Sequence, residues 1–417
     1  MEFLKHQLDN GLQVVAERNP NAYSMAIGYF VRTGSRDETD ELAGVSHFLE
    51  HMVFKGTQRR SAADVNRELD AIGSESNAYT NEEQTVYYAS FLPEYQDRAA
   101  DLLSDIMRPA LRESDFEMEK KVILEEIAKY EDQPPFGATE KVMAAHFGDH
   151  PLSRSVLGST ESVSALTAEQ MRDYFATRYS PGNMALVATG NVDFDGLVRS
   201  AEQFCGDWER AVAPRSTPPA SARQGVHFLK KEMAVQQYGL LVSSGPASED
   251  DARYTARMLA TVVGDGSGSR FYWDLVETGR AEYAEMSPYD FQGAGVMITF
   301  LGCAPDASAD VWRSAHEILA EVQQTGVTSQ ELEQAKNKLC SHIVLASERP
   351  GNRLFAVGSN WIQIDRYRSV REVIDRCRAV TVDQIDQFIS QHPLTEYTAM
   401  WVGPETQIES PVETADH

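Results

Sequence analysis

The sequence predicts an α+β protein made of two similar halves. Each half begins with short apolar strands, continues with amphipathic helices and ends with a buried strand, which is the pattern of a duplicated unit. A chain of 417 residues is also too long for one ordinary hydrophobic core. The Pro-, Ala- and Ser-rich stretch at residues 211–224 is typical of a linker. We therefore expect two homologous α/β sandwich domains, each a mainly antiparallel sheet packed by helices, at residues 1–210 and 225–417.

The first half opens with strands. A turn at Asp9-Asn10-Gly11 precedes an apolar strand at residues 12–16, and residues 25–31 alternate as a second strand does. Ser61 is a suitable N-cap for a helix that extends to Ile72. The other expected elements are an extended pair at residues 77–80 and 85–91, helices between residues 93 and 147 and from 167 to 178, and a buried strand at 185–190.

The second half repeats this order. Strands are expected at residues 226–229 and 238–242, a helix at 250–263, a strand at 296–301, and helices at 309–324 and 329–347. The last strand, at residues 397–403, holds the place that residues 184–190 hold in the first half. The prediction of a duplicated unit therefore depends on the matching order of strands and helices as well as on the similar lengths of the two halves.

Charge excludes some partners. The formal net charge of −25 argues against nucleic acid and against anionic membranes. The acidity would steer basic peptides toward the protein, or it reflects a generally acidic, well-hydrated surface; charge alone does not decide between these.

Several features indicate the cytoplasm. No apolar run approaches the roughly 18 residues of a membrane span. The N-terminal residues lack the basic and apolar segments of a signal peptide, so a cytoplasmic location is expected. The four cysteines are scattered without a C-x-x-C pair, as free thiols in a reducing compartment are: Cys205, Cys303, Cys340 and Cys377.

His47, Glu50 and His51 form an H-x-x-E-H motif in a helix-like stretch. Side chains four apart on a helix share a face, so the two imidazoles can meet at one point. Two imidazoles suit a zinc ion, and the adjacent carboxylate suits a general base acting on a metal-bound water. The alternative is an amphipathic helix with an exposed Glu50. The apolar neighbours on several sides, among them Phe48 and Met52, argue against a solvated face.

A catalytic zinc usually has three protein ligands, so a third donor is expected elsewhere. The helix-like run at residues 117–130 offers Glu119 and Glu126, which are two turns apart and share a face, whereas Glu125 is rotated by about 100°. One carboxylate would bind the metal and another would orient a ligand. Spacing alone does not choose between Glu125 and Glu126, and a charged surface helix is the alternative for the whole run.

Longer stretches around these residues resemble a known family. HFLEHMVFKGT at residues 47–57, followed by EKKVILEE at 119–126, is similar to the pitrilysin and insulinase family of inverzincins, particularly its mitochondrial-processing-peptidase-like branch. Further matches cover much of the first half: Gly34-Ser35-Arg36, Asn77-Ala78-Tyr79-Thr80, Gln84-Thr85-Val86-Tyr87-Tyr88 and Tyr179-Ser180-Pro181-Gly182-Asn183-Met184.

The resemblance implies roles for these residues. It implies one Zn2+ per chain held by His47, His51 and Glu126, with Glu50 as the base and Glu119 as the carboxylate that orients a ligand. It also implies that an edge strand containing Asn77, Ala78 and Tyr79 pairs with the substrate backbone. From the residues alone this stretch is equally well an ordinary sheet edge.

The second half departs from the family pattern. Catalytic members carry an Arg and a Tyr seven residues apart that stabilise the oxyanion; here Tyr283 matches the Tyr, but Val276 stands at the Arg position. Arg280 is near, at the wrong spacing. Arg280 could substitute, a partner subunit could supply the Arg, or the chain could be a weak or specialised peptidase.

The sequence therefore predicts a zinc endopeptidase that cleaves peptides or unfolded segments, with Glu50, Glu119 and Tyr283 as catalytic residues. The expected partners are a peptide substrate and, in a dimer, an identical chain or a related chain that bears the Arg and Tyr; no nucleic acid or membrane is expected. The alternative is a non-catalytic assembly subunit, similar to the core proteins of a respiratory complex, although such proteins have usually lost part of the zinc motif.

Overall fold

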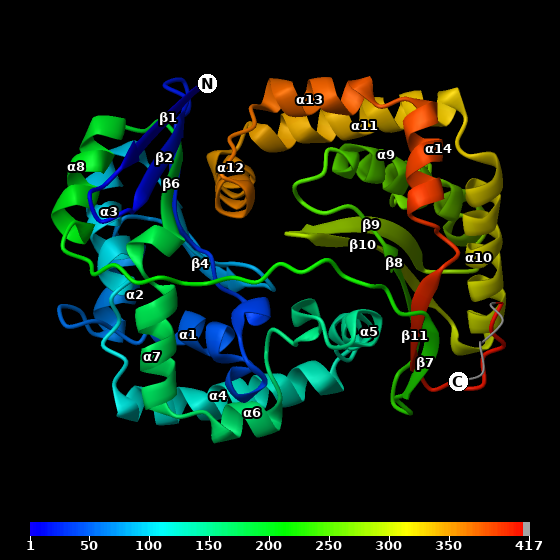
Figure 1. The fold of residues 1–417 in the computed structure, drawn as a ribbon, viewed down its shortest axis with the longest axis horizontal. Helices are drawn as coiled ribbons and strands as arrows, with labels where there is room; N and C mark the ends of the chain where they lie inside the picture. Colours follow the sequence, from blue (N-terminus) through cyan, green and yellow to red (C-terminus); the bar gives the residue numbers. More distant parts are fainter. Residues whose placement is uncertain (412–417) are drawn as a thin grey trace. The chain divides into compact units, whose positions relative to one another are not determined.

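The strands of this computed structural model, which describes residues 1–411, form two sheets packed by helices, and the expected α+β class is confirmed (Figure 1). Contacts divide the chain into two compact units. The first contains Met1–Ala128, Arg154–Ser216 and Leu345–Arg368, and the second contains Lys129–Ser153, Thr217–Val344 and Ser369–His417. The last six residues of the second expected domain, 412–417, lie outside the described residues.

The sheet of the first unit has the strand order β1-β2-β6-β3-β5-β4. Only β2 and β6 pair in parallel among these neighbours, so the sheet is mainly antiparallel, as expected. Strand β4 is an edge strand. The strands are β1 (Glu2–Gln7), β2 (Gln13–Arg18), β3 (Met25–Val31), β4 (Glu75–Thr80), β5 (Thr85–Phe91) and β6 (Met184–Gly190).

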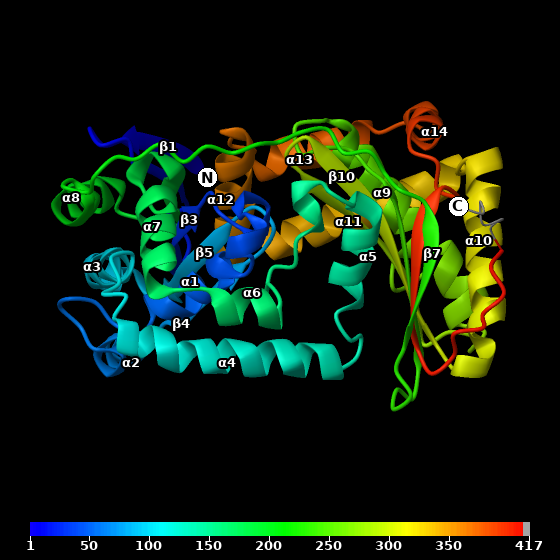
Figure 2. The ribbon, with the colours of Figure 1, turned by 60° about the horizontal axis from the view of Figure 1, so that its bottom comes forward.

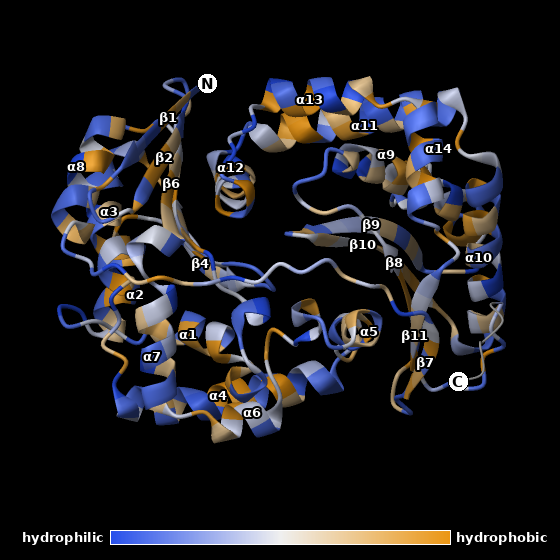
Figure 3. Ribbon diagram, viewed as in Figure 1, coloured by the Kyte–Doolittle hydropathy of each residue, from blue (hydrophilic) through white to orange (hydrophobic). Residues whose placement is uncertain are grey.

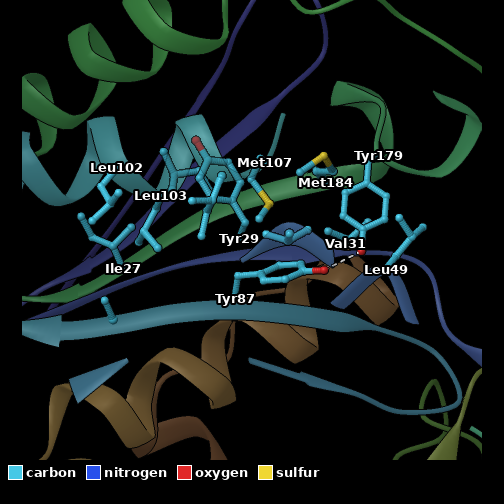
Figure 4. Packing of buried hydrophobic residues seen from close by; sticks show 14 of the residues in the cluster. Ile27, Tyr29, Val31, Leu49, Tyr87, Leu102, Leu103, Met107, Tyr179 and Met184 are labelled. Carbon is cyan, nitrogen blue, oxygen red and sulfur yellow. Dashed lines mark hydrogen bonds between the residues drawn. The ribbon is translucent and has the colours of Figure 1, made fainter. Parts of the chain in front are cut away.

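Helices cover both faces of this sheet. On one face, alternate residues of β3 such as Ile27 and Tyr29 pack with helices α1, α3, α4, α7 and α8 in the largest core of the unit (Figure 4). Tyr87 on β5 and Tyr179 hydrogen-bond through their hydroxyls at 2.8 Å in the same core. The helices are α1 (Val45–Val53), α2 (Ala62–Ala71), α3 (Gln96–Ile106), α4 (Glu113–Asp132), α6 (Thr160–Ala165), α7 (Ala168–Arg178) and α8 (Phe194–Cys205).

The other face is covered by α12 (Pro350–Ile364), which comes from the second half of the sequence. Leu354 and Val357 pack against the alternate residues of the strands, including Phe30. A buried ion pair, in which Arg353 donates Nε to Glu17 Oε1 at 2.7 Å, fixes the helix on β2. Each apolar side chain buried here contributes about 1.5–3 kcal/mol, so the first sheet depends on a helix encoded far from it.

The sheet of the second unit has the order β7-β11-β8-β10-β9 and repeats the first without β1. In both sheets the closing strand, β6 or β11, pairs in parallel on one side and antiparallel on the other. The strands are β7 (Gly225–Lys230), β8 (Gln237–Ser244), β9 (Tyr283–Phe291), β10 (Ala294–Cys303) and β11 (Tyr397–Gly403).

Helix α5 (Ala138–Phe147), from the first half of the sequence, packs on one face of this sheet through Val142, Met143 and Phe147. The opposite face packs against helices of the second half: α9 (Ala252–Gly264), α10 (Ser308–Thr325), α11 (Ser329–Ser347), α13 (Val370–Ala379) and α14 (Val382–Gln391). These helices carry hydrophobic and hydrophilic residues on different sides (Figure 3). Each half of the sequence thus supplies one helix that packs on the sheet of the other half.

The expected helices and strands of both halves are present with small shifts at their ends, and Ser61 caps α2 by accepting a hydrogen bond from Asp64 N. Strand β9 and helices α6, α8, α12, α13 and α14 had no sequence expectation. All four cysteines are free and buried, and among residues 1–411 no helix combines the length and apolarity needed to cross a bilayer.

The expected linker contains no helix or strand, and the chain passes from the first unit to the second between Ser216 and Thr217. Its first residues are held in place: Arg178 donates to the carbonyl of Pro214 at 2.7 Å, and Arg215 forms an ion pair with Asp37. This part of the linker is therefore anchored to the first unit.

Gly358→Ala tests the dependence of the first sheet on α12. A Cβ at Gly358 would lie 2.2 Å from Cζ of Phe30, which is fully buried and cannot move aside. Overpacking costs about 1–3 kcal/mol, more than the roughly 1 kcal/mol gained in helix propensity. Thermal unfolding should show a lower midpoint, whereas Gly351→Ala in the same helix, which meets only Ser90 Oγ at 3.2 Å, should leave it nearly unchanged. Equal midpoints for both variants would contradict the packing described here.

Candidate metal centre

Helix α1 carries His47, Glu50 and His51. The start of this helix is fixed by a close backbone approach and by a buried carboxylate. Gly44 precedes the helix in the left-handed region with φ +92°, where a Cβ would lie 2.6 Å from the carbonyl of Leu157. The buried Glu38 carboxylate accepts hydrogen bonds from the backbone N–H groups of Gly44 and Ser46, both at 2.8 Å. A carboxylate at this end of a helix satisfies N–H groups that have no intrahelical partner.

Helix α4 runs alongside α1 (Figure 2). The rings of Phe48 on α1 and Phe116 on α4 stack with their centres 4.7 Å apart and their planes 10° from parallel. Glu119 and Glu126 follow Phe116 by one and by nearly three helical turns on the same helix. The aromatic contact therefore sets how these two carboxylates face the motif helix.

Three donor atoms meet between the helices. Nitrogen and carboxylate oxygen atoms of His47, His51 and Glu126 all lie within 4.8 Å of one another. Glu126 Oε2 lies 3.8 Å from His47 Nε2 and 3.5 Å from His51 Nε2. Glu125 is exposed and takes no part in this cluster. The structure thus distinguishes the two adjacent glutamates that spacing alone leaves equivalent.

The donor set fits zinc. Two ligands bound tetrahedrally at about 2.0–2.1 Å lie about 3.3 Å apart, close to the separations seen here. Burial, with a smaller contribution from His51, lowers the pKa of His47 to about 4, so this imidazole is neutral at pH 7, as a metal ligand must be. Among the described residues His47 Nδ1 is buried without a hydrogen-bond partner.

His51 is oriented by a chain of two further residues. Its Nδ1 lies 2.9 Å from Glu119 Oε1, and the other oxygen of this buried carboxylate lies 2.5 Å from Lys55 Nζ. A hydrogen bond donated by Nδ1 leaves the lone pair of His51 on Nε2, which faces Glu126. Sequence reasoning found Glu119 but missed Lys55, which lies four residues after His51 in the turn that follows α1.

Glu50 is held by the sheet. Thr80, the last residue of β4, donates its hydroxyl to Glu50 Oε2 at 2.6 Å. Burial raises the pKa of Glu50, while the hydrogen bond from Thr80 and the nearby His51 lower it. A carboxyl with a raised pKa beside a metal cluster has the properties of a general base. The sequence places Thr80 in the matching stretch Asn77-Ala78-Tyr79-Thr80 but does not predict this contact with Glu50.

The predicted substrate-binding residues Asn77, Ala78 and Tyr79 lie on edge strand β4, which leads to Thr80. Tyr79 is fixed from behind: its hydroxyl accepts a hydrogen bond from Gln84 Nε2 at 3.0 Å, and the same Nε2 lies 3.0 Å from Ser359 Oγ on α12. The exchanged helix therefore supports the strand beside Glu50.

Tyr283, Val276 and Arg280 lie in the second unit. Tyr283 begins β9, and burial raises the pKa of its hydroxyl to about 12. Arg280 donates to Asp310 Oδ2 at 2.8 Å and to Ser314 Oγ. Val276 packs partly buried against the core of this unit. Arg280 is thus already engaged within its own unit.

Comparison with known proteins identifies the family. Residues 13–160 match the model of the insulinase family, peptidase family M16, and residues 165–339 match the peptidase M16 inactive domain. A relative from Mycobacterium tuberculosis, named an uncharacterized zinc protease, is 35% identical over 405 residues, which cover 95% of this chain and 92% of that protein. The chain belongs to the M16 peptidase family.

Other similar proteins agree with this assignment in sequence or in fold. The zinc protease YmxG of Bacillus subtilis, also named uncharacterized, is 28% identical over 97% of this chain and 99% of its own. A protease from Helicobacter pylori has the same fold, with a TM-score of 0.90, 19% identity and coverage of 97% and 99%. A chain in a structure of complex III from Candida albicans also shares it, with a TM-score of 0.84, 17% identity and coverage of 99% and 97%.

Lys55→Met tests the chain of contacts to His51. Losing the ammonium should leave Glu119 and the imidazole less well oriented, and such changes typically weaken metal binding about 10–100-fold. Competition with a chromophoric chelator would measure the zinc dissociation constant. Lys121→Met, which changes an exposed lysine on α4, is the matched control and should bind zinc as the parent does. An unchanged dissociation constant in Lys55→Met would remove Lys55 from the site.

Proposed function

We propose that this chain is a zinc-dependent endopeptidase that cleaves peptides or unfolded segments. The observation that carries the proposal is the convergence of donor atoms from His47, His51 and Glu126 beside the carboxylate of Glu50. Membership of the M16 family and relatives named zinc proteases support it.

In this proposal His47, His51 and Glu126 hold one zinc ion. Zinc, when bound, polarises the scissile carbonyl and lowers the pKa of a coordinated water toward 7. Glu119 keeps His51 in the tautomer that presents Nε2, and Lys55 holds Glu119. Burial keeps the imidazole of His47 neutral, and the contact with Glu119 fixes the orientation of His51.

Glu50 is the proposed base. It accepts a proton from the attacking water and later delivers it to the leaving amine. The hydrogen bond from Thr80 to Oε2 restrains the carboxylate and leaves Oε1 for the proton. Because burial raises its pKa, Glu50 is a stronger base than an exposed glutamate.

Edge strand β4 is the proposed substrate-binding element. Main-chain hydrogen bonds from Asn77, Ala78 and Tyr79 would align an extended peptide without reading its sequence. Thr80 connects this strand to Glu50, so a peptide paired with β4 would lie next to the base. This arrangement suits unfolded segments, because a folded substrate has no free strand to offer.

Stabilisation of the oxyanion is assigned to Tyr283 together with a group supplied by a second chain. One oxyanion donor is commonly worth about 3–4 kcal/mol of barrier. Val276 cannot donate a hydrogen bond, and Arg280 is paired with Asp310 and Ser314. We therefore favour a dimer with a related chain that bears the Arg and Tyr over replacement of the missing Arg by Arg280. An identical chain would carry the same Val276.

The alternative, a non-catalytic assembly subunit, is suggested by the fold of the Candida albicans complex III chain. At 17% identity that similarity extends to the fold alone. The intact set of His47, Glu50, His51 and Glu126 favours the peptidase, because a scaffold has no need for buried donors that converge on one point.

Glu50→Gln tests the function directly. The amide keeps the shape of the side chain but cannot take up a proton, so the variant should bind zinc as the parent does while turnover falls by at least 100-fold, on the order expected for loss of a general base. Cleavage of a quenched peptide library, with zinc content measured on the same samples, would follow both. If turnover stayed within a few-fold of the parent, Glu50 would not be the base.

A further inference from the structure

A pocket lies in the first unit, away from the metal cluster. Its volume is about 490 Å³, within the range of small-molecule sites. It is formed by the end of α3, by α7 and by the residues after α8, and its walls include Ser104, Arg108, Phe175, Phe204, Asp207 and Trp208. None of the donors of the metal cluster lines it.

Arg108 is the central group of this pocket. Its guanidinium lies 3.6 Å from the centre of the Trp208 ring and 5.9 Å from that of Phe175. Nη1 donates to the carbonyl of Met107 at 2.6 Å, but within residues 1–411 no carboxylate forms an ion pair with Arg108. Figure 4 shows Met107 in the adjoining core.

Burial lowers the pKa of Arg108 to about 10, so the side chain remains a cation at neutral pH. A largely buried cation without an anion is unfavourable, and contact with aromatic faces compensates only in part. An anionic group on a ligand would complete its surroundings, because a guanidinium presents donors in a geometry that matches a carboxylate.

The carboxylates of the pocket differ in availability. Asp105 is occupied: its Oδ2 accepts from Thr57 at 2.7 Å and from Arg60 at 2.9 Å. Asp207 and Glu209 are exposed, and neither forms an ion pair in the part of the chain that the structure describes. Asp207 is close enough to Arg108 to raise its pKa. The pocket therefore has a cation in its wall and carboxylates nearby. These carboxylates would repel a ligand that carries only negative charge.

The apolar part of the wall is formed by aromatic side chains. Phe175 and Phe204 are half-buried, and Phe175 stacks on Tyr179 with ring centres 4.8 Å apart. Tyr179 is held in turn by Tyr87 (Figure 4). Arg59 also lines the pocket, but its guanidinium is paired with Asp101 at 2.8 Å. Apart from the paired Arg59 and Asp105, a rigid aromatic wall lies beside one cation and two carboxylates, which matches a molecule with an apolar body and charges of both signs at one end.

We propose that this pocket binds a free amino acid with an apolar side chain. The ligand's carboxylate pairs with Arg108, its ammonium group with Asp207 or Glu209, and its side chain lies against Phe175 and Phe204. Hydrolysis of terminal peptide bonds, which follows internal cleavage such as that proposed above, is the class of reaction that supplies this ligand. Binding at this pocket does not depend on the proposed peptidase activity, because none of the residues that line the pocket belongs to the metal cluster.

Isothermal titration of the zinc-loaded full chain with L-leucine tests the proposal. Saturable binding with half-saturation below about 1 mM is expected. Leucinamide, which lacks the carboxylate, and 4-methylpentanoate, which lacks the ammonium group, should each bind at least ten-fold more weakly. No saturable binding of L-leucine would overturn the proposal, and so would equal binding of either analogue.

Arg108→Gln locates the site. It should weaken L-leucine binding at least ten-fold, whereas Arg98→Gln, which changes an exposed arginine on α3, should leave binding unchanged. Full binding in Arg108→Gln would place the ligand elsewhere and overturn the assignment. If Arg108→Gln fails to fold, Asp207→Asn combined with Glu209→Gln at the exposed edge carries the same test: leucine binding should weaken at least ten-fold, and full binding would contradict the proposal.

Discussion

The contact between α1 and α4 is the interaction on which the site depends. The stacked rings of Phe48 and Phe116 set the spacing of the two helices, and the hydrogen bond between His51 and Glu119 sets their rotation. Without this pair of contacts, Glu126 would not face the imidazoles of α1. Together these two contacts bring three donor atoms within 4.8 Å of one another.

The exchange of helices makes each unit depend on both halves of the sequence. Helix α12 completes the first sheet and supports Tyr79 on β4 through Gln84, while α5 covers one face of the second sheet. A fragment ending at the linker would leave one face of the first sheet open to water, with apolar residues of every central strand exposed. The half without the H-x-x-E-H motif thus has a structural role in the half that carries it.

Periodicity predicts most of the helices and strands and the main residues of the metal centre. Helix geometry alone places His47 and His51 on one face of their helix, and Glu119 and Glu126 on one face of theirs. It could not choose between Glu125 and Glu126, since the choice depends on how α4 is rotated against α1. It missed Lys55 and Thr80 because their partners come from other segments of the chain. An amphipathic pattern shows that a helix has one packed face but not which sheet it covers, so the exchange of α5 and α12 was not foreseen. Strand β9 was missed because Pro288 and Asp290 interrupt its pattern.

The most direct test of this account is the zinc-to-chain ratio of the purified protein, measured by elemental mass spectrometry on the parent and on two matched variants. The account predicts one zinc per chain in the parent and in Glu125→Gln, and almost none in Glu126→Gln, because of these two adjacent glutamates it is Glu126 that reaches the imidazoles. Full zinc in Glu126→Gln, or none in the parent, would contradict the assignment of the metal centre to the junction of α1 and α4.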